Sequence, residues 1–73
     1  MASIAREIRA ELVAQKRTIG ELSTCTGIPR GRLGSRLRDQ SPLTTTEIEL
    51  IAQELAVPGW ELMRRAAERD RAA

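Results

Sequence analysis

Four arginines lie close together in the middle of the chain, at Arg30, Arg32, Arg36 and Arg38, with no acidic residue among them. Arginine carries a planar guanidinium that donates forked hydrogen bonds to phosphate oxygens and to the edge of guanine. Outside residues 30–38 the chain has eight basic and ten acidic residues, so positive charge is concentrated in this segment. A basic segment on an otherwise acidic chain indicates a polyanionic partner.

The residue types that are missing narrow the chemistry further. The chain has no histidine and one cysteine, so it lacks the usual proton carrier at neutral pH and cannot assemble a zinc finger. It also has no phenylalanine or tyrosine on which unpaired bases could stack. We therefore expect no enzymatic activity, no cofactor and no small-molecule substrate, and we favour double-stranded DNA as the partner.

The length of 73 residues predicts a single domain over residues 1–73. A core of this size is small, so association with a second copy, at least on DNA, is expected to help. No apolar run of about 18 residues is present, which predicts no membrane span. The lone Cys25 cannot form an internal disulfide, which favours a reducing, cytoplasmic setting.

Capping signals divide the first part of the chain into helices. Ser3 is an expected N-cap for a helix over residues 3–16. Thr18 followed by Glu21 has the spacing of a capping box and opens a short helix. That helix is expected to end at Gly27, because glycine readily adopts the left-handed conformation found after helices.

The same signals continue in the second part. Pro29 suits a first helical position, so the next helix is predicted over residues 29–38. Thr44 with Glu47 forms a second capping box for a helix that runs to about residue 56, and residues 57–59 separate it from a last helix. The expected fold is all-α, a compact five-helix bundle in which residues 26–28 join a helix-turn-helix.

Apolar residues recur at helical spacing in each predicted helix. The expected buried positions are Ile4, Ile8, Leu12, Leu22, Cys25, Leu33, Leu37, Ile48, Ile51, Ala52 and Leu55. In the last helix Trp60 is expected to fill the core, and Met63 with the neighbouring alanines to lie in the core or in a dimer contact. The charged residues of the first and last helices are expected on the polar, solvent-facing sides, among them Glu7, Glu11, Arg64, Arg65 and Arg69.

The helix over residues 29–38 can turn its arginines outward. If Leu33 and Leu37 are buried, steps of about 100° per residue place the opposite side in solvent. A helix roughly 10–12 Å across fits a major groove about 12 Å wide. The residues expected to read bases are Arg30, Gly31, Arg32, Gly34 and Ser35. Phosphates are expected near Arg36 and Arg38 at its far end, and near Lys16, Arg17 and Thr18 at the start of the second helix.

Gly31 and Gly34 are unusual in so short a helix, because glycine lowers helix stability relative to alanine by about 1 kcal/mol in a helix interior. Two explanations remain open. The missing side chains could allow close approach to base edges, or tertiary packing could require them.

With these predicted helices and apolar positions, the chain resembles the lambda-repressor and Cro-type helix-turn-helix family over roughly residues 4–62. The resemblance is carried by Ile8, Thr18, Leu22, Gly27, Ile28 and Leu33, and downstream by Ile48, Ile51, Ala52, Leu55, Val57, Glu61 and Leu62. Two positions depart from the family pattern. Ser23 stands where alanine is frequent, and Arg36 stands at a position that is usually apolar, so that either the helix is rotated or Arg36 extends along the surface to solvent.

The resemblance implies a five-helix bundle whose third helix enters the major groove. It implies base-reading roles for Arg30, Gly31, Gly34 and Ser35, and phosphate contacts from Thr18, Ile19, Gly20 and Arg38. Members of the family are typically transcriptional repressors or regulators, often from phages, that bind two-fold operators as dimers.

The expected function is that of a Cro-like transcriptional regulator that represses by covering an operator. The chain could instead be the DNA-binding part of a longer repressor. The alternative from another class is an antitoxin-type interaction protein that acts by protein contact and binds DNA for autoregulation.

Overall fold

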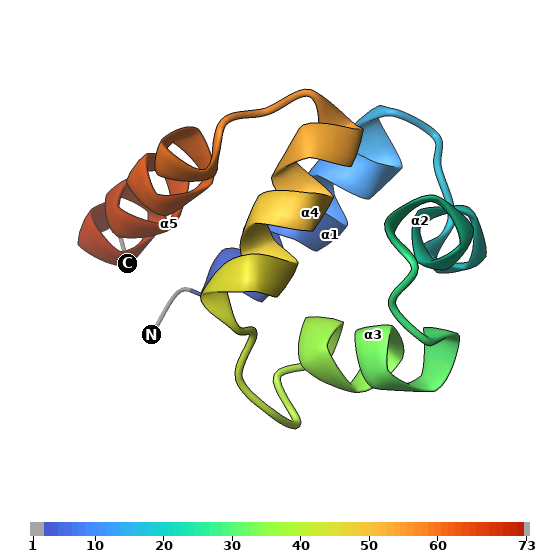
Figure 1. Cartoon of the computed structure of the whole chain (residues 1–73). Helices are drawn as coiled ribbons and strands as arrows, with labels where there is room; N and C mark the ends of the chain where they lie inside the picture. The colour runs from blue at the N-terminus through green and yellow to red at the C-terminus, as the bar shows by residue number, and fades with distance from the viewer. Residues whose placement is uncertain (1–2, 73) are drawn as a thin grey trace.

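A computed structural model describes residues 3–72 and contains, over that range, five α-helices and no strand. They are α1 (Ile4–Ala14), α2 (Ile19–Thr26), α3 (Arg30–Leu37), α4 (Thr45–Leu55) and α5 (Gly59–Ala72). The all-α prediction is confirmed. In Figure 1, α1 and α4 form the middle of the molecule, α5 lies on one side, and α2 and α3 lie on the other. None of these helices is long and apolar enough to cross a lipid bilayer.

The predicted caps set the helix starts. The hydroxyl groups of Ser3, Thr18 and Thr44 each accept a hydrogen bond from a backbone N–H in the first turn of α1, α2 and α4. At Thr44 the capping box is complete, because Glu47 also accepts from the Thr44 N–H at 2.9 Å. Gly27 ends α2 with φ of 79°, the left-handed value predicted for it.

Helix boundaries differ from the sequence prediction by one or two residues, and α3 is one residue shorter at each end than predicted. The first helix ends at Ala14 rather than near Lys16, because Lys16 adopts a left-handed φ of 56° and turns the chain toward α2. Pro29 lies just before α3 in extended backbone, so the first helical residue is Arg30.

The core lies between the helices and draws apolar side chains from all five. Ile8, Leu22, Leu33, Leu37, Ile51, Leu55 and Leu62 are its largest fully buried side chains. Ile4, Ile19 and Leu43 are partly buried against it. The predicted core positions of α1, α3 and α4 are therefore largely confirmed, with Ile4 and Ile48 only half-buried.

The prediction that Trp60 fills the core is wrong. Its side chain is 66% exposed and that of Met63 is 51% exposed, while Leu62 and Ala66 are buried. Leu62 and Ala66 are four residues apart and share a helix face, whereas Trp60 lies about 200° around the helix from Leu62. Packing against α1 and α4 selects the Leu62 side of α5 and leaves Trp60 outside.

Ion pairs join α5 to α1, and they overturn the expectation that Glu7 faces solvent. Glu7 is only 3% exposed, and its carboxylate accepts two hydrogen bonds from Arg69, at 2.6 and 3.2 Å. One turn on, Arg65 donates to Glu11 at 2.7 Å. A buried carboxylate requires such a partner, since burial without one is costly.

Ala56 ends α4 in the left-handed conformation, with φ of 58°, although it is not glycine. A β-carbon is strained in this conformation, by about 1–2 kcal/mol. We expect Ala56→Gly to raise the free energy of unfolding by about 0.5–1 kcal/mol, since the greater freedom of the unfolded chain offsets part of the relief. Urea unfolding followed by circular dichroism measures this change. Ala14→Gly is the control at a helical φ and should have the opposite sign; equal signs at both positions would contradict the explanation.

Glu47 should make folding stability depend on pH. Burial raises the pKa of this carboxyl, but hydrogen bonds from the Thr44 backbone and hydroxyl, together with the Arg36 guanidinium, outweigh burial and lower it below the ordinary value of 4.5. Because the folded pKa is depressed, the stabilisation is present above about pH 4.5 and is lost as pH falls further. Unfolding by urea at pH 7 and pH 3 should show a smaller loss for Glu47→Gln than for the unchanged chain. An identical loss would show that Glu47 is not responsible.

Candidate nucleic-acid interface

Helices α2 and α3 are joined by residues 27–29 and held together by local hydrogen bonds. The left-handed Gly27 reverses the chain, and Ile28 turns into the core, where it is 6% exposed. The Ser23 hydroxyl donates to the Ile28 backbone oxygen at 2.6 Å. Ser23 therefore links α2 to the connection that follows it.

Helix α3 is fixed along one side. Leu33 and Leu37 are both fully buried, as predicted from their spacing. From α1, the Arg9 guanidinium donates to the backbone oxygen of Leu37. Just after the end of α3, Asp39 accepts a hydrogen bond from the Ser3 hydroxyl at 3.0 Å. These contacts set the rotation of α3 about its own axis and so decide which residues face outward.

The outer side of α3 carries most of the residues expected to read bases. Arg30, Gly31 and Arg32 are exposed, and Ser35 is half-buried. Gly34 is different, because it is buried. A β-carbon at Gly34 would lie 3.6 Å from the Arg38 guanidinium, so the Arg38 side chain lies across this glycine.

Arg30, Arg32 and Arg38 have no ion pair within the described part of the chain, whereas most arginines of the other helices do. The paired guanidinium groups belong to Arg9, Arg17, Arg36, Arg64, Arg65 and Arg69. Since α3 carries no acidic residue, its outer side presents unneutralised positive charge to solvent. Such a surface attracts anions.

A shallow hollow of about 420 Å³ connects the outer side of α3 with the start of α2. It is lined by Ile19, Arg30, Gly31, Gly34 and Arg38. A β-carbon at Gly20 would lie 3.8 Å from the guanidinium carbon of Arg30, so Arg30 extends over the first turn of α2. The structure therefore brings three residues expected to read bases, Arg30, Gly31 and Gly34, onto one surface with two expected at phosphates, Ile19 and Arg38.

The start of α2 offers hydrogen-bond donors next to this hollow. Thr18 is exposed, and Ile19 and Gly20 are half-buried in the first turn, where backbone N–H groups lack partners within the helix. Lys16 is exposed nearby. These groups could contact a phosphate that lies against the hollow.

Arg17, expected at a phosphate, is already bound within the protein. Its guanidinium donates to the backbone oxygen of Glu54 at 3.0 Å and to the Glu54 carboxylate at 2.9 Å. The hydrogen bond from Arg17 is also the main cause that lowers the pKa of Glu54. Arg17 therefore ties the α1–α2 connection to α4 and stands apart from the unpaired arginines.

Arg36 is likewise engaged inside the molecule. Its Nε lies 3.2 Å from a carboxylate oxygen of Glu47, and its side chain is half-buried. The charged end thus binds Glu47, which also completes the α4 capping box, instead of extending to solvent. This pairing lets a charged residue occupy a half-buried position of α3. The capping-box pattern in the sequence identified Glu47 as a residue at the start of α4. It gave no reason to pair Glu47 with Arg36.

Cys25 was expected in the core and is exposed instead. It lies near the end of α2, where the Arg17 guanidinium approaches its sulfur at 3.7 Å. Leu22, three residues earlier, supplies the buried contact of α2. A helix of eight residues needs few inward positions, and Cys25 is not one of them.

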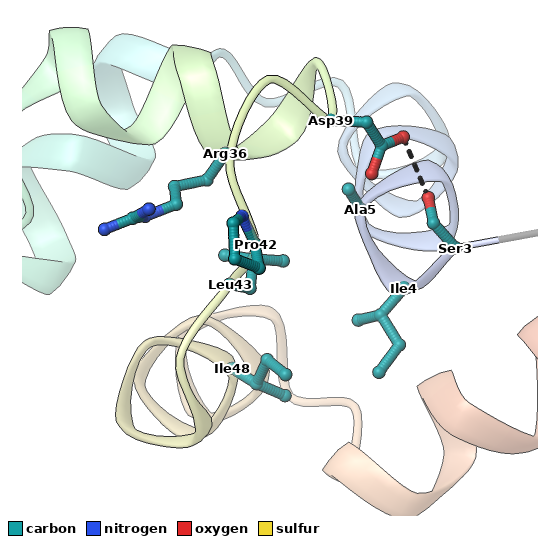
Figure 2. Close-up of a pocket in the computed structure, with 8 residues that line it drawn as sticks. All are labelled: Ser3, Ile4, Ala5, Arg36, Asp39, Pro42, Leu43 and Ile48. Atoms are coloured by element: carbon teal, nitrogen blue, oxygen red, sulfur yellow. Dashed lines mark hydrogen bonds between the residues drawn. The ribbon is translucent and has the colours of Figure 1, made fainter.

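A second hollow, of about 260 Å³, lies where the connection after α3 meets the starts of α1 and α4 (Figure 2). Its lining is mainly apolar, with Ile4, Leu43 and Ile48 grouped around the opening, while the Arg36 side chain points away from Asp39. The Ser3–Asp39 hydrogen bond closes one edge.

The outer side of α3 and the start of α2 are thus the surface best suited to an anionic partner. Comparisons of the chain with family models, with curated proteins and with solved structures find no match.

Proposed function

We propose that this protein is a sequence-specific double-stranded DNA-binding regulator of transcription, Cro-like in design, in which α2 and α3 form a helix-turn-helix. The observation that carries the proposal is the set of three arginines without an ion pair in residues 3–72: Arg30 and Arg32 on the exposed side of α3, and Arg38 at its C-cap. The opposite side of α3 is buried through Leu33 and Leu37. A free guanidinium on a rigid helix keeps its forked donors available for guanine or phosphate.

Each element has a role in this proposal. Helix α3 lies in the major groove, where Arg30 and Arg32 reach base edges near its start. Arg38, at the other end, contacts the sugar–phosphate backbone. The first turn of α2 contacts a phosphate on the same strand or across the groove. A regulator bound in this way would prevent polymerase from occupying the same DNA.

A two-fold operator would require two copies of the chain. Each copy would place its α3 in successive major grooves on one face of the duplex, about 34–36 Å apart. The DNA sequence that the protein selects from a random library therefore reports the stoichiometry. A dimer selects an inverted repeat, and a monomer selects a single short site.

Selection from a random duplex library tests the proposal. The protein should enrich one motif, and its affinity for that motif should fall with salt, with a log–log slope near −0.9 for each phosphate neutralised. Enrichment of no motif would contradict a DNA-reading function.

A second candidate is an antitoxin-type interaction protein, and the exposed side of α5 favours it. Trp60 and Met63 are both more than half exposed and lie three residues apart on the same helix face. Tryptophan and methionine are enriched where proteins bind one another. Under this candidate Trp60→Ala abolishes binding to a protein partner, and Arg30→Ala does not. Under the DNA-binding proposal Arg30→Ala weakens binding to DNA, and Trp60→Ala does not.

A further inference from the structure

Gly31 lies on the outer side of α3 with open space around it. A β-carbon at this position would meet no other atom within 4 Å, the backbone is helical, and the residue is exposed. Alanine favours helices more than glycine does. Packing and backbone conformation therefore give no reason for glycine here, which excludes one of the two explanations left open by the sequence.

Gly34 provides the contrast within the same helix. A β-carbon there would lie 3.6–3.9 Å from the guanidinium atoms of Arg38, and the residue is buried. An alanine methyl group there would lie in ordinary van der Waals contact with Arg38. Both glycines line the hollow between α3 and α2, but Arg38 lies over Gly34, whereas Gly31 is uncovered.

Both neighbours of Gly31 in the sequence are unpaired arginines. Their guanidinium groups can engage phosphate or guanine, whereas Gly31 presents only backbone and Cα–H atoms. In the major groove the one apolar group that projects from the base edges is the 5-methyl group of thymine. An uncharged gap beside charged side chains fits that methyl group in size and polarity.

We propose that Gly31 is a specificity-determining residue whose missing side chain leaves space for the 5-methyl group of a thymine. This inference rests on the proposed DNA-binding function. The methyl group of an alanine at this position would occupy the same space. Removing the methyl group from the DNA should therefore compensate for adding one to the protein.

The test combines Gly31→Ala with thymine-to-uracil changes, made one at a time, in the duplex that the unchanged protein selects. Gly31→Ala should melt at the same temperature or higher and bind the selected duplex about tenfold more weakly, as overpacking does. Uracil at one thymine should restore most of that affinity. The same uracil should weaken the unchanged protein by about fourfold, the loss of one buried methyl contact.

Gly34→Ala is the matched control, because its added methyl group would lie against Arg38 rather than the DNA. No uracil change should improve its binding. The proposal is overturned, with the DNA-binding function intact, if Gly31→Ala binds the selected duplex as well as the unchanged protein does. It is also overturned if no uracil restores the affinity or if Gly31→Ala melts at a lower temperature. Failure to select any duplex would overturn the DNA-binding function itself and this inference with it.

Discussion

Replacing Leu33 with alanine should remove about 2–5 kcal/mol from the free energy of unfolding, the range measured for buried leucines that leave a cavity. Leu33 is fully buried in the middle of α3. Small domains are stable by only about 5–15 kcal/mol in total, so the loss would be a large part of the whole. Helix α3 has eight residues and is too short to be stable alone, so its tertiary contacts maintain it.

Urea unfolding followed by circular dichroism measures the effect of Leu33→Ala. Leu50→Ala is the matched control, because Leu50 is a leucine of α4 that is 38% exposed. Its loss should cost far less, since its side chain already contacts water. Comparable losses at both positions would show that Leu33 does not anchor α3.

Arg30→Ala should remove sequence discrimination at one base pair of the selected duplex, worth about 1–3 kcal/mol for a bidentate contact to guanine. Its guanidinium has no ion pair in residues 3–72, so removing it leaves the fold intact. Competition between the selected duplex and variants changed at each position measures the discrimination. The position that becomes indifferent in Arg30→Ala is the one that Arg30 reads.

Two further arginines provide controls for that experiment. Arg38→Ala should weaken binding to all duplexes by similar amounts and reduce the salt dependence by about one phosphate. Arg64→Ala, on α5, removes a guanidinium that pairs with Glu61 and with Glu68, the latter at 2.6 Å, and should leave DNA affinity unchanged. Equal effects of Arg30→Ala and Arg64→Ala would mean that net charge alone governs binding.

Local rules predicted the helices and their ends. The hydroxyl caps at Ser3, Thr18 and Thr44 and the left-handed Gly27 are determined by residues within four positions of one another. The buried pair Leu33 and Leu37 followed from spacing within a single helix. Together these local features also indicated which side of α3 faces outward.

Contacts between distant residues were not predictable in this way. The pair of Glu7 with Arg69 and the pair of Arg17 with Glu54 join residues that are 62 and 37 positions apart. Charged residues on a helix are expected in water unless the fold supplies a partner, and sequence spacing does not show which partner that is. For the same reason the exposed side of α5 could not be chosen, since Trp60 with Met63 and Leu62 with Ala66 have equally helical spacing.

The central claim is that the outer side of α3, together with the start of α2, contacts double-stranded DNA. Titrating the ¹⁵N-labelled protein with its selected duplex while recording amide chemical shifts tests this directly. We expect the largest changes in amide chemical shift at residues 18–20 and 30–38. The amide shifts of Trp60 and Met63 on α5 should change little when the protein first contacts DNA. Changes concentrated on α5, with the amides of α3 unmoved, would contradict the claim.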